Sequence, residues 1–450
     1  MNHMHIGRAG SGKTTQLIER VVQELEQRPL GEKMYFIVPD QMSFEMERRI
    51  ATDERIAGLV RLEVMSLRRF AFHILRDYGN QAIPFLDETG TQLLLRQVVE
   101  ESEDELKIFK RTKNMPGFFQ GLDELIASFK RSLIEPDMLR QVSDRSLERS
   151  PKLNDLALIY ERFTERIVNK ALHADDYYTT LLTLLPKARL NQATIIVDGF
   201  YEFSLQEQQV LLALMQQVSE VHISFTMDAT DPYAKQTSFG VSQRCYMQLI
   251  GQMQEQSIPY EEVLYEQPVK FRSEGLRHLE QALLKPGYPS VDYDVDGFQM
   301  TAAVNRQVEA EAAVRKAIQL VRQKGYRFHE MAFVVRHLEP YADHLERAFQ
   351  MYDIPYFLDQ RESMVHHPLV DLIQSALDIV TSGYREETVF RLLKTELLPI
   401  PAEDARLALD RFETFVLERG IKGSMWQQPW QLKRRLAEEV RLTEEELAQE

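Results

Sequence analysis

The first 75 residues alternate between two spacings of apolar side chains. Three short apolar runs predict buried β-strands: MHI near the N-terminus, KMYFIVP, which a proline closes, and RLEVMS. The stretches that follow them, at residues 14–27, 43–52 and 67–79, carry apolar side chains at helical spacing. Alternation of strands with helices is typical of a parallel sheet that helices cover on both faces. We therefore expect an α/β fold.

A long helical segment interrupts this alternation at residues 85–189. It reads as nearly continuous helix, with breaks at Pro116, Pro136 and Pro151. The strand pattern then resumes with ATIIVDGF, which begins at residue 193, and VHISFTMD, which begins at residue 221. We interpret residues 85–189 as a helical insertion and the two later runs as strands that complete the same sheet.

A second alternation begins after a polar connector at residues 251–296. The runs FQMTAAVN, MAFVVR and IPYFLD predict strands, and helical stretches separate them. This pattern predicts a second, smaller parallel sheet, followed by helix up to Glu450. Because the chain stops inside RLTEEELAQE without a capping glycine or proline, we expect a truncated polypeptide. The expected segments are 1–84 and 190–296 for the first sheet domain with its connector, 85–189 for its insertion, 297–370 for the second domain, and 371–450 for the start of a second insertion.

Composition limits the kind of protein further. The 450 residues are 44% hydrophobic and 27% charged, as in soluble globular proteins, and no apolar run is long enough to span a membrane. A single cysteine, Cys245, excludes an intrachain disulfide framework and an iron–sulfur cluster held by four thiolates. The N-terminus lacks the pattern of a secretory signal, so we expect a cytoplasmic protein.

The charge pattern bears on nucleic-acid binding. A net charge of −15 weighs against a surface coated with basic groups, but it is compatible with a local basic groove. The stretch RLEVMSLRRFAFHILR carries four arginines against one acidic residue, Glu63. This stretch is either part of such a groove or a solvated helix face.

The segment after the first strand matches a nucleotide-binding motif. GRAGSGKT satisfies G-x-x-x-x-G-K-[ST] in full, between a predicted strand and a predicted helix. The glycines let backbone N–H groups surround phosphates at a helix N-terminus, where the helix dipole favours negative charge. Lys13 would reach the β- and γ-phosphates, and the Thr14 hydroxyl would bind Mg²⁺. We predict a site for ATP and Mg²⁺ at Gly7, Arg8, Ala9, Gly10, Ser11, Gly12, Lys13, Thr14 and Thr15; the alternative is a tight glycine turn that binds nothing.

A second motif bears on whether the nucleotide is hydrolysed. A magnesium-binding aspartate should end an apolar strand of the same sheet, and Asp198 follows TIIV. In ATP-driven motors the next residue is usually a glutamate that polarises the attacking water, but here it is Gly199. Glycine can neither orient water nor accept a proton. Glu202 either substitutes for that base or is a surface residue. We therefore predict nucleotide binding with poor hydrolysis.

With both motifs in place, the sequence resembles a superfamily 1, UvrD-like DNA helicase. More closely, it resembles the B subunit of the AddAB-type helicase–nuclease, with which the RexAB group belongs. Four stretches carry the resemblance: GRAGSGKTTQLIERV; YFIVPDQMSFEMERRI with RLEVMSLRRFAFHIL after it; ATIIVDGFYEFSLQEQQVL; and MAFVVRHLEPYADHLERAFQMYDIPYFLDQRESMVHHPLVDLI. The resemblance implies two RecA-like parallel-sheet domains of P-loop NTPase and UvrD-like helicase architecture, each with a helical insertion.

The same resemblance implies partners and a function. In this family the B subunit forms a heterodimer with a motor A subunit, binds single-stranded and duplex-end DNA, and reads the single strand in double-strand break repair and recombination. Its own motor is decayed, which agrees with Gly199. The family's nuclease domain holds an iron–sulfur cluster with four cysteines, and this chain, with one cysteine, cannot form that cluster. The alternative function is an autonomous, DNA-stimulated P-loop ATPase or helicase.

The resemblance also supplies candidate binding residues. Positions that match the family's DNA-contacting motifs are Gln41, Ser43, Leu67, Arg69 and Phe72, and Phe200 is a further stacking candidate. Gln41 can bond a base edge, Arg69 a phosphate or base, and an aromatic ring can stack on a base. Leu67 and Phe72 fit a helix core equally well. Arg336, which ends MAFVVR, is either an arginine that approaches the nucleotide phosphates or an ordinary strand-end cation.

Overall fold

The computed structural model describes most of the chain. The described residues are 1–56, 58–79, 86–113, 115, 117–145, 150–168, 171, 173, 175–233, 239–271, 273–283, 298–359, 364, 367–400 and 404–427. The chain divides into two compact units, Met1–Gln299 and Met300–Glu450.

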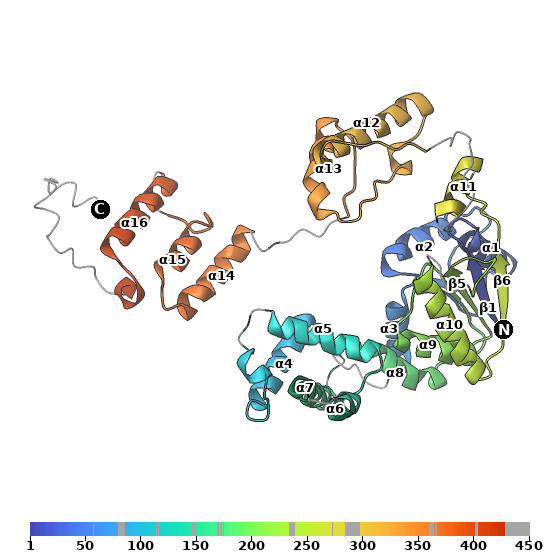
Figure 1. Ribbon diagram of the computed structural model, residues 1–450, viewed down its shortest axis with the longest axis horizontal. Helices are drawn as coiled ribbons and strands as arrows, with labels where there is room; N and C mark the ends of the chain where they lie inside the picture. The colour runs from blue at the N-terminus through green and yellow to red at the C-terminus, as the bar shows by residue number, and fades with distance from the viewer. Residues whose placement is uncertain are drawn as a thin grey trace, which may run out of the picture. The chain divides into compact units, whose positions relative to one another are not determined.

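A six-stranded, all-parallel sheet forms the centre of the first unit (Figure 1). Its strands are β1 (Asn2–Gly7), β2 (Met34–Ile37), β3 (Leu62–Met65), β4 (Thr194–Val197), β5 (Glu220–Thr226) and β6 (Tyr260–Tyr265). Their spatial order is β3-β2-β4-β5-β1-β6. The first five strands coincide with the predicted apolar runs, so the predicted α/β fold with a parallel sheet is confirmed.

Helices cover both faces of this sheet. On one face, α1 (Lys13–Gln27) and α2 (Ser43–Ala51) pack apolar side chains such as Leu17 and Ile50 against Phe36 of β2. The helices on the other face are α3 (Leu67–Tyr78), α8 (Tyr177–Leu184), α9 (Leu205–Gln217) and α10 (Gly240–Glu255). Each apolar side chain that is fully buried in these layers contributes about 1.5–3 kcal/mol. The packed sheet therefore holds the loops at its carboxyl edge in defined positions.

The sixth strand lies inside the stretch that the sequence pattern assigned to a polar connector. β6 pairs in parallel with β1, and its register places Tyr265 beside Gly7. Its sequence, YEEVLY, carries Glu261 and Glu262, and it occupies the edge of the sheet. An edge strand tolerates charged side chains because only one of its sides is covered. Because of these two glutamates, the search for apolar runs did not identify this strand. The connector also contains α11 (Glu274–Leu283), while residues 284–297 lie outside the described part.

The predicted helical insertion has a core of its own. Its helices are α4 (Glu88–Glu101), α5 (Phe118–Arg131), α6 (Pro136–Arg145) and α7 (Pro151–Ile167), with a short 3₁₀ turn, η2 (Phe109–Arg111). Pro136 and Pro151 each begin a helix, where the missing N–H of proline is harmless, and Pro116 lies outside the described residues. The buried Asp155 carboxylate accepts hydrogen bonds of 2.7–3.1 Å from three successive backbone N–H groups, those of residues 107, 108 and 109. These bonds fix the loop before η2 against α7.

The second unit consists of helices with two separate cores. α12 (Arg306–Lys324), η4 (Phe328–Glu330) and α13 (Glu339–Met351) enclose one core, which includes Val314 and Phe349. The other elements are α14 (Pro368–Thr381), α15 (Glu386–Leu393), α16 (Ala405–Arg419) and η5 (Gly423–Gln427), and Phe390 and Val416 belong to the second core. Throughout the described part of the chain, no helix is long and apolar enough to cross a lipid bilayer.

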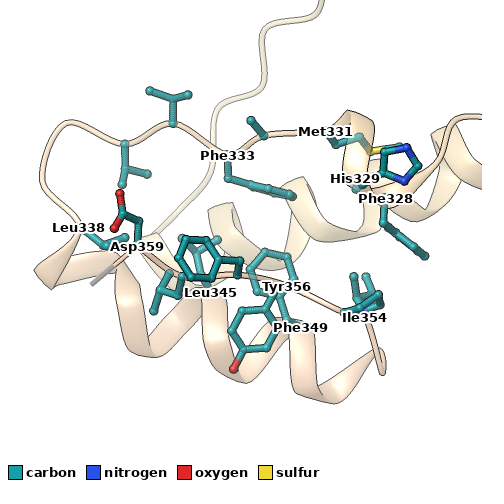
Figure 2. A pocket seen from close by; sticks show the side chains of 17 residues that line it. Phe328, His329, Met331, Phe333, Leu338, Leu345, Phe349, Ile354, Tyr356 and Asp359 are labelled. Carbon is teal, nitrogen blue, oxygen red and sulfur yellow. The ribbon is translucent and has the colours of Figure 1, made fainter. Parts of the chain in front are cut away.

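The described residues of the second unit do not form the second parallel sheet that the sequence pattern predicted. Residues 331–336 and 354–359 belong to no strand. Residues 331–335 and 354–359 line an apolar cavity of about 990 Å³ beside α13, in which Phe333 and Tyr356 both contact Phe349 (Figure 2). A short continuous apolar run is compatible with a buried strand, but a strand also needs a neighbour about 4.8 Å away to share its hydrogen bonds. The described part of this unit provides no such neighbour.

Candidate nucleotide and DNA site

The glycine-rich loop connects β1 directly to α1, as the motif requires. Gly10 and Gly12 adopt φ angles of 80° and 95°, which favour glycine. At Gly7, a Cβ would lie 2.5 Å from Ser11 Oγ and 2.8 Å from Tyr265 Cβ, so no side chain fits there. The glycines are therefore needed both for the turn of the loop and for its close approach to β6.

Lys13 folds over this loop from the first turn of α1. Its Nζ donates to the carbonyl oxygens of Gly7 at 2.6 Å and Arg8 at 3.0 Å, and the side chain is almost fully buried. Burial lowers the pKa of Lys13 to about 8, and the nearby Asp198 carboxylate opposes that shift. This desolvated ammonium donates to two neutral carbonyl oxygens. It can replace these hydrogen bonds with stronger ones to charged phosphate oxygens.

Asp198 ends β4 with one carboxylate oxygen available for a cation. The Ser224 hydroxyl donates to Oδ1, while Oδ2 is buried and has no hydrogen-bond partner. The residue is 2% exposed. An orphaned, buried carboxylate oxygen beside a P-loop fits Mg²⁺, which prefers oxygen ligands and keeps several waters. Thr14, half-buried in the first turn of α1, is the second candidate ligand.

Gly199 occupies a position that no other residue fits well. Its φ angle is 84°, and a Cβ there would lie 2.9 Å from Met42 Sδ and 3.3 Å from Pro39 Cδ. A glutamate would therefore need both a strained backbone and a displaced neighbour. Glu202, the substitute base considered from the sequence, is exposed. The geometry of the loop after β4 thus accounts for the absence of the usual acidic residue.

The other side of the P-loop is held by residues that the sequence motifs did not indicate. Arg8 forms ion pairs with Glu280 of α11 at 2.9 Å and with Asp228 at 3.4 Å, and it lies over the ring of Phe239. The backbone N–H of Lys270 donates to the Gly10 carbonyl at 3.0 Å. The segment after β6 therefore crosses the glycine-rich loop. Motif spacing gives no signal for these contacts because they join residues more than 200 positions apart.

The candidate DNA contacts lie at the carboxyl ends of three neighbouring strands, β3, β2 and β4. Neighbouring strands are about 4.8 Å apart, so the loops that follow them meet at one edge of the sheet. Gln41 is exposed in a short 3₁₀ turn, η1 (Asp40–Met42), after β2. Arg69 is exposed in the first turn of α3, after β3. Both side chains are accessible to a ligand along this edge.

The remaining candidates are less accessible. Ser43 and Leu67 are buried, and Leu67 belongs to the core, which is the alternative that the sequence left open. The Phe72 ring is half-buried, with its centroid 4.3 Å from that of Tyr177. Phe200 is half-buried against Phe203, at 5.1 Å between ring centroids. These four residues shape the edge from beneath.

Two exposed aromatic residues stand beside these candidates. Phe44 is 77% exposed in the first turn of α2, and Tyr201 is 69% exposed in the loop after β4. Phe44 follows Ser43 in the sequence and Tyr201 follows Phe200, so both aromatic residues belong to the motifs that predicted DNA contacts. We name Gln41, Phe44, Arg69 and Tyr201 together the sheet-edge cluster.

Arg336 belongs to the second unit, where it is exposed at the end of the segment 331–336. Arg306, in the same unit, lies over the ring of Tyr341, at 5.8 Å from the ring centroid. An approach of Arg336 to the nucleotide phosphates stays a prediction.

The parallel sheet, the glycine-rich loop and the buried aspartate define the chain as an α/β protein of the P-loop class. A family model described as the N-terminal part of AddB matches residues 4–280. The chain is 75% identical over 450 residues to the B subunit of the ATP-dependent helicase/deoxyribonuclease of Exiguobacterium sibiricum, covering 100% of this chain and 39% of that protein. It is 35% identical over 441 residues to the protein of the same name from Bacillus subtilis, covering 94% of this chain and 38% of that protein. The chain belongs to the AddB family and spans about two fifths of the length of these relatives.

Proposed function

We propose that this chain is the nucleotide-binding, single-stranded-DNA-scanning part of a helicase–exonuclease subunit that acts in double-strand break repair and recombination in the cytoplasm. Its partner is the motor A subunit, with which it forms a heterodimer. It binds ATP with Mg²⁺ at Lys13, Thr14 and Asp198. These 450 residues have no nuclease activity of their own and little ATP turnover.

The observation that carries the proposal is the contrast between Asp198 and Gly199. The bare Asp198 Oδ2 and the buried Lys13 ammonium supply the charges that a magnesium nucleotide needs. The next position has no base, and a side chain there would require a strained backbone at φ 84° and would displace Met42. Phosphoryl transfer to water depends on a group that positions the water, so binding is supported while turnover is not.

The sheet-edge cluster supports the DNA-binding part of the proposal. Exposed aromatic rings such as Phe44 and Tyr201 are stacking platforms that every base can use. Arg69, with its neighbour Arg68, supplies local positive charge in a chain that is acidic overall. Stacking with a few cationic contacts suits a strand that slides, because neither interaction depends strongly on base identity.

The proposal is tested by measuring nucleotide binding and ATP turnover of the chain alone, with and without single-stranded DNA. The expected result is binding of ATP with Mg²⁺, its loss in Lys13→Ala, and turnover that DNA does not stimulate. Lys33→Ala is the matched control, because Lys33 is an exposed lysine paired with Glu63 at the start of β2. Brisk DNA-stimulated turnover that disappears in Lys13→Ala would instead establish an autonomous motor.

A further inference from the structure

A cluster of polar side chains lies between α1 and the strands β1, β5 and β6. His3 and His222 are register partners on β1 and β5, with rings stacked at 4.7 Å and 10°. His3 Nε2 lies 3.1 Å from Glu220 Oε1, and His222 Nε2 lies 3.4 Å from the same oxygen. His222 is fully buried, whereas His3 and Glu220 are partly exposed, which leaves a path from solvent.

A hydrogen-bond chain sets the tautomer of the neutral His222 ring, whose Nε2 faces Glu220, when the Tyr265 hydroxyl acts as the donor to Gln16. The Tyr265 hydroxyl donates to Gln16 Oε1 at 3.0 Å, so its oxygen accepts from His5 Nδ1–H at 2.9 Å. His5 Nε2 then accepts from His222 Nδ1–H at 3.0 Å. In the neutral ring, His222 Nε2 is left with its lone pair, buried and without a hydrogen bond. That lone pair points toward the Glu220 carboxylate.

The Arg20 guanidinium already pairs with this carboxylate, and His222 Nε2 is the buried atom left without a hydrogen bond. A divalent cation between His222 Nε2 and Glu220 Oε1 would give that nitrogen a partner without charging the ring. It also matches the hydrogen-bond chain, because a metal-bound histidine usually donates its other N–H to a polar partner, as His222 does to His5.

We propose that His3, Glu220 and His222 bind a divalent transition metal of the Zn²⁺ class, with water in the fourth position. Ligand bonds of about 2.0–2.1 Å at tetrahedral angles separate two ligand atoms by about 3.4 Å. The two contacts to Glu220 already have nearly this length, at 3.1 and 3.4 Å. All three ligand atoms lie within 4.8 Å of one another, so the two imidazoles need to approach by about 1.4 Å at most. The bound ion would join β1 to β5.

Two neighbouring charges modulate this site in opposite directions. Arg20 of α1 donates to Glu220 Oε1 at 2.7 Å and competes with the metal for that oxygen. Glu261 of β6 lies 3.6 Å from His3 Nδ1, where it stabilises the N–H of a metal-bound His3. Removal of the Arg20 guanidinium should therefore strengthen metal binding. This opposite effect distinguishes a real site from general damage to the sheet.

The test uses the full chain without a histidine tag, stripped with a chelator and titrated with Co²⁺ and Zn²⁺. The expected result is one equivalent of saturable binding, with the visible absorption of four-coordinate Co²⁺ and a raised melting temperature. Loss of a group that only orients a ligand typically weakens metal binding roughly 10–100-fold, and loss of a ligand should cost at least as much. His3→Ala and Glu220→Gln should therefore bind at least about tenfold more weakly. Both change partly exposed side chains, so the sheet is expected to fold.

The controls separate this site from adventitious binding. His337→Ala removes an exposed histidine of the second unit and should leave the affinity unchanged. Arg20→Ala should bind Co²⁺ more tightly than the parent chain, since the competing guanidinium is gone. Absence of a saturable site, or equal affinity in the parent, His3→Ala and Glu220→Gln chains, would overturn the proposal. Weaker binding by Arg20→Ala would contradict the assigned geometry.

Discussion

Replacement of Gly199 by alanine should destabilise the first unit although it adds only one methyl group. The left-handed backbone at φ 84° disfavours a residue with a Cβ by about 1–2 kcal/mol. The contact with Met42 Sδ at 2.9 Å adds roughly 0.5–1.5 kcal/mol, because that side chain must leave its rotamer while Pro39 cannot move. The lower entropy of the unfolded alanine chain offsets about 0.4–1 kcal/mol. The net loss is about 0.5–3 kcal/mol.

The matched control is Gly121→Ala at an exposed position in the first turn of α5, where a Cβ meets nothing within 4 Å. That change should stabilise by about 0.5–1 kcal/mol, since alanine favours a helix over glycine. Both variants are compared by urea titration followed by far-UV circular dichroism. Tryptophan fluorescence is unsuitable, because both tryptophans, Trp426 and Trp430, belong to the second unit.

The function of the same position is tested with Gly199→Glu, which restores the acidic pair of a motor. We expect no gain in ATP turnover, because the strained backbone prevents the new carboxylate from reaching the position of a catalytic base. Combining it with Met42→Ala relieves the steric contact but leaves the backbone cost. A Gly199→Ala chain as stable as the parent, or a Gly199→Glu chain that hydrolyses ATP, would refute this reasoning.

Three further outcomes are expected. Asp155→Ala should lower the free energy of unfolding by about 2–3 kcal/mol in urea titrations, because three backbone N–H groups lose their buried acceptor. Asp137→Ala, which changes an exposed carboxylate, should change the free energy of unfolding little. Nucleotide affinity should fall about tenfold from pH 7 to pH 9, because a pKa of about 8 leaves Lys13 mostly neutral at the higher pH. In the same titration, Lys13→Arg should abolish this pH dependence. Phe44→Ala and Tyr201→Ala should each weaken binding of an oligothymidine, measured by fluorescence anisotropy, by about 1–3 kcal/mol, and an equal loss in a control change of exposed Tyr326 would count against the sheet-edge cluster.

The sequence pattern predicted strands well where burial on both faces makes them uniformly apolar, as in TIIV of β4. It missed β6, whose two glutamates are compatible with an edge position that only the assembled sheet reveals. It predicted strands at residues 331–336 and 354–359, which are short apolar runs, but no described neighbour supplies a hydrogen-bond ladder there. A local pattern encodes which way side chains point, and pairing depends on residues elsewhere in the chain.

The candidate sites also differ in how far the sequence predicts them. The P-loop could be predicted because its residues are consecutive, and the structure places them in a loop with the expected glycine geometry. The cluster of His3 and His222 could not, because only the register between β1 and β5 brings together residues so far apart in sequence. The crowding of Gly199 by Met42 was equally hidden. The sequence showed which residue was there, whereas the structure shows why a larger one does not fit.

That crowding also connects the two proposed sites. In the proposed nucleotide site Asp198 binds Mg²⁺, and the next residue, Gly199, lies beside Met42, which is between Gln41 and the turn that carries Phe44. Coordination of Mg²⁺ by Asp198 would therefore act one residue away from Gly199, which lies beside Met42 in the loop after β2. A shift of the Asp198–Gly199 backbone would displace this loop. We expect the affinity of the chain for single-stranded DNA to change when a magnesium nucleotide binds, without hydrolysis, and Met42→Ala to reduce this coupling while both ligands still bind.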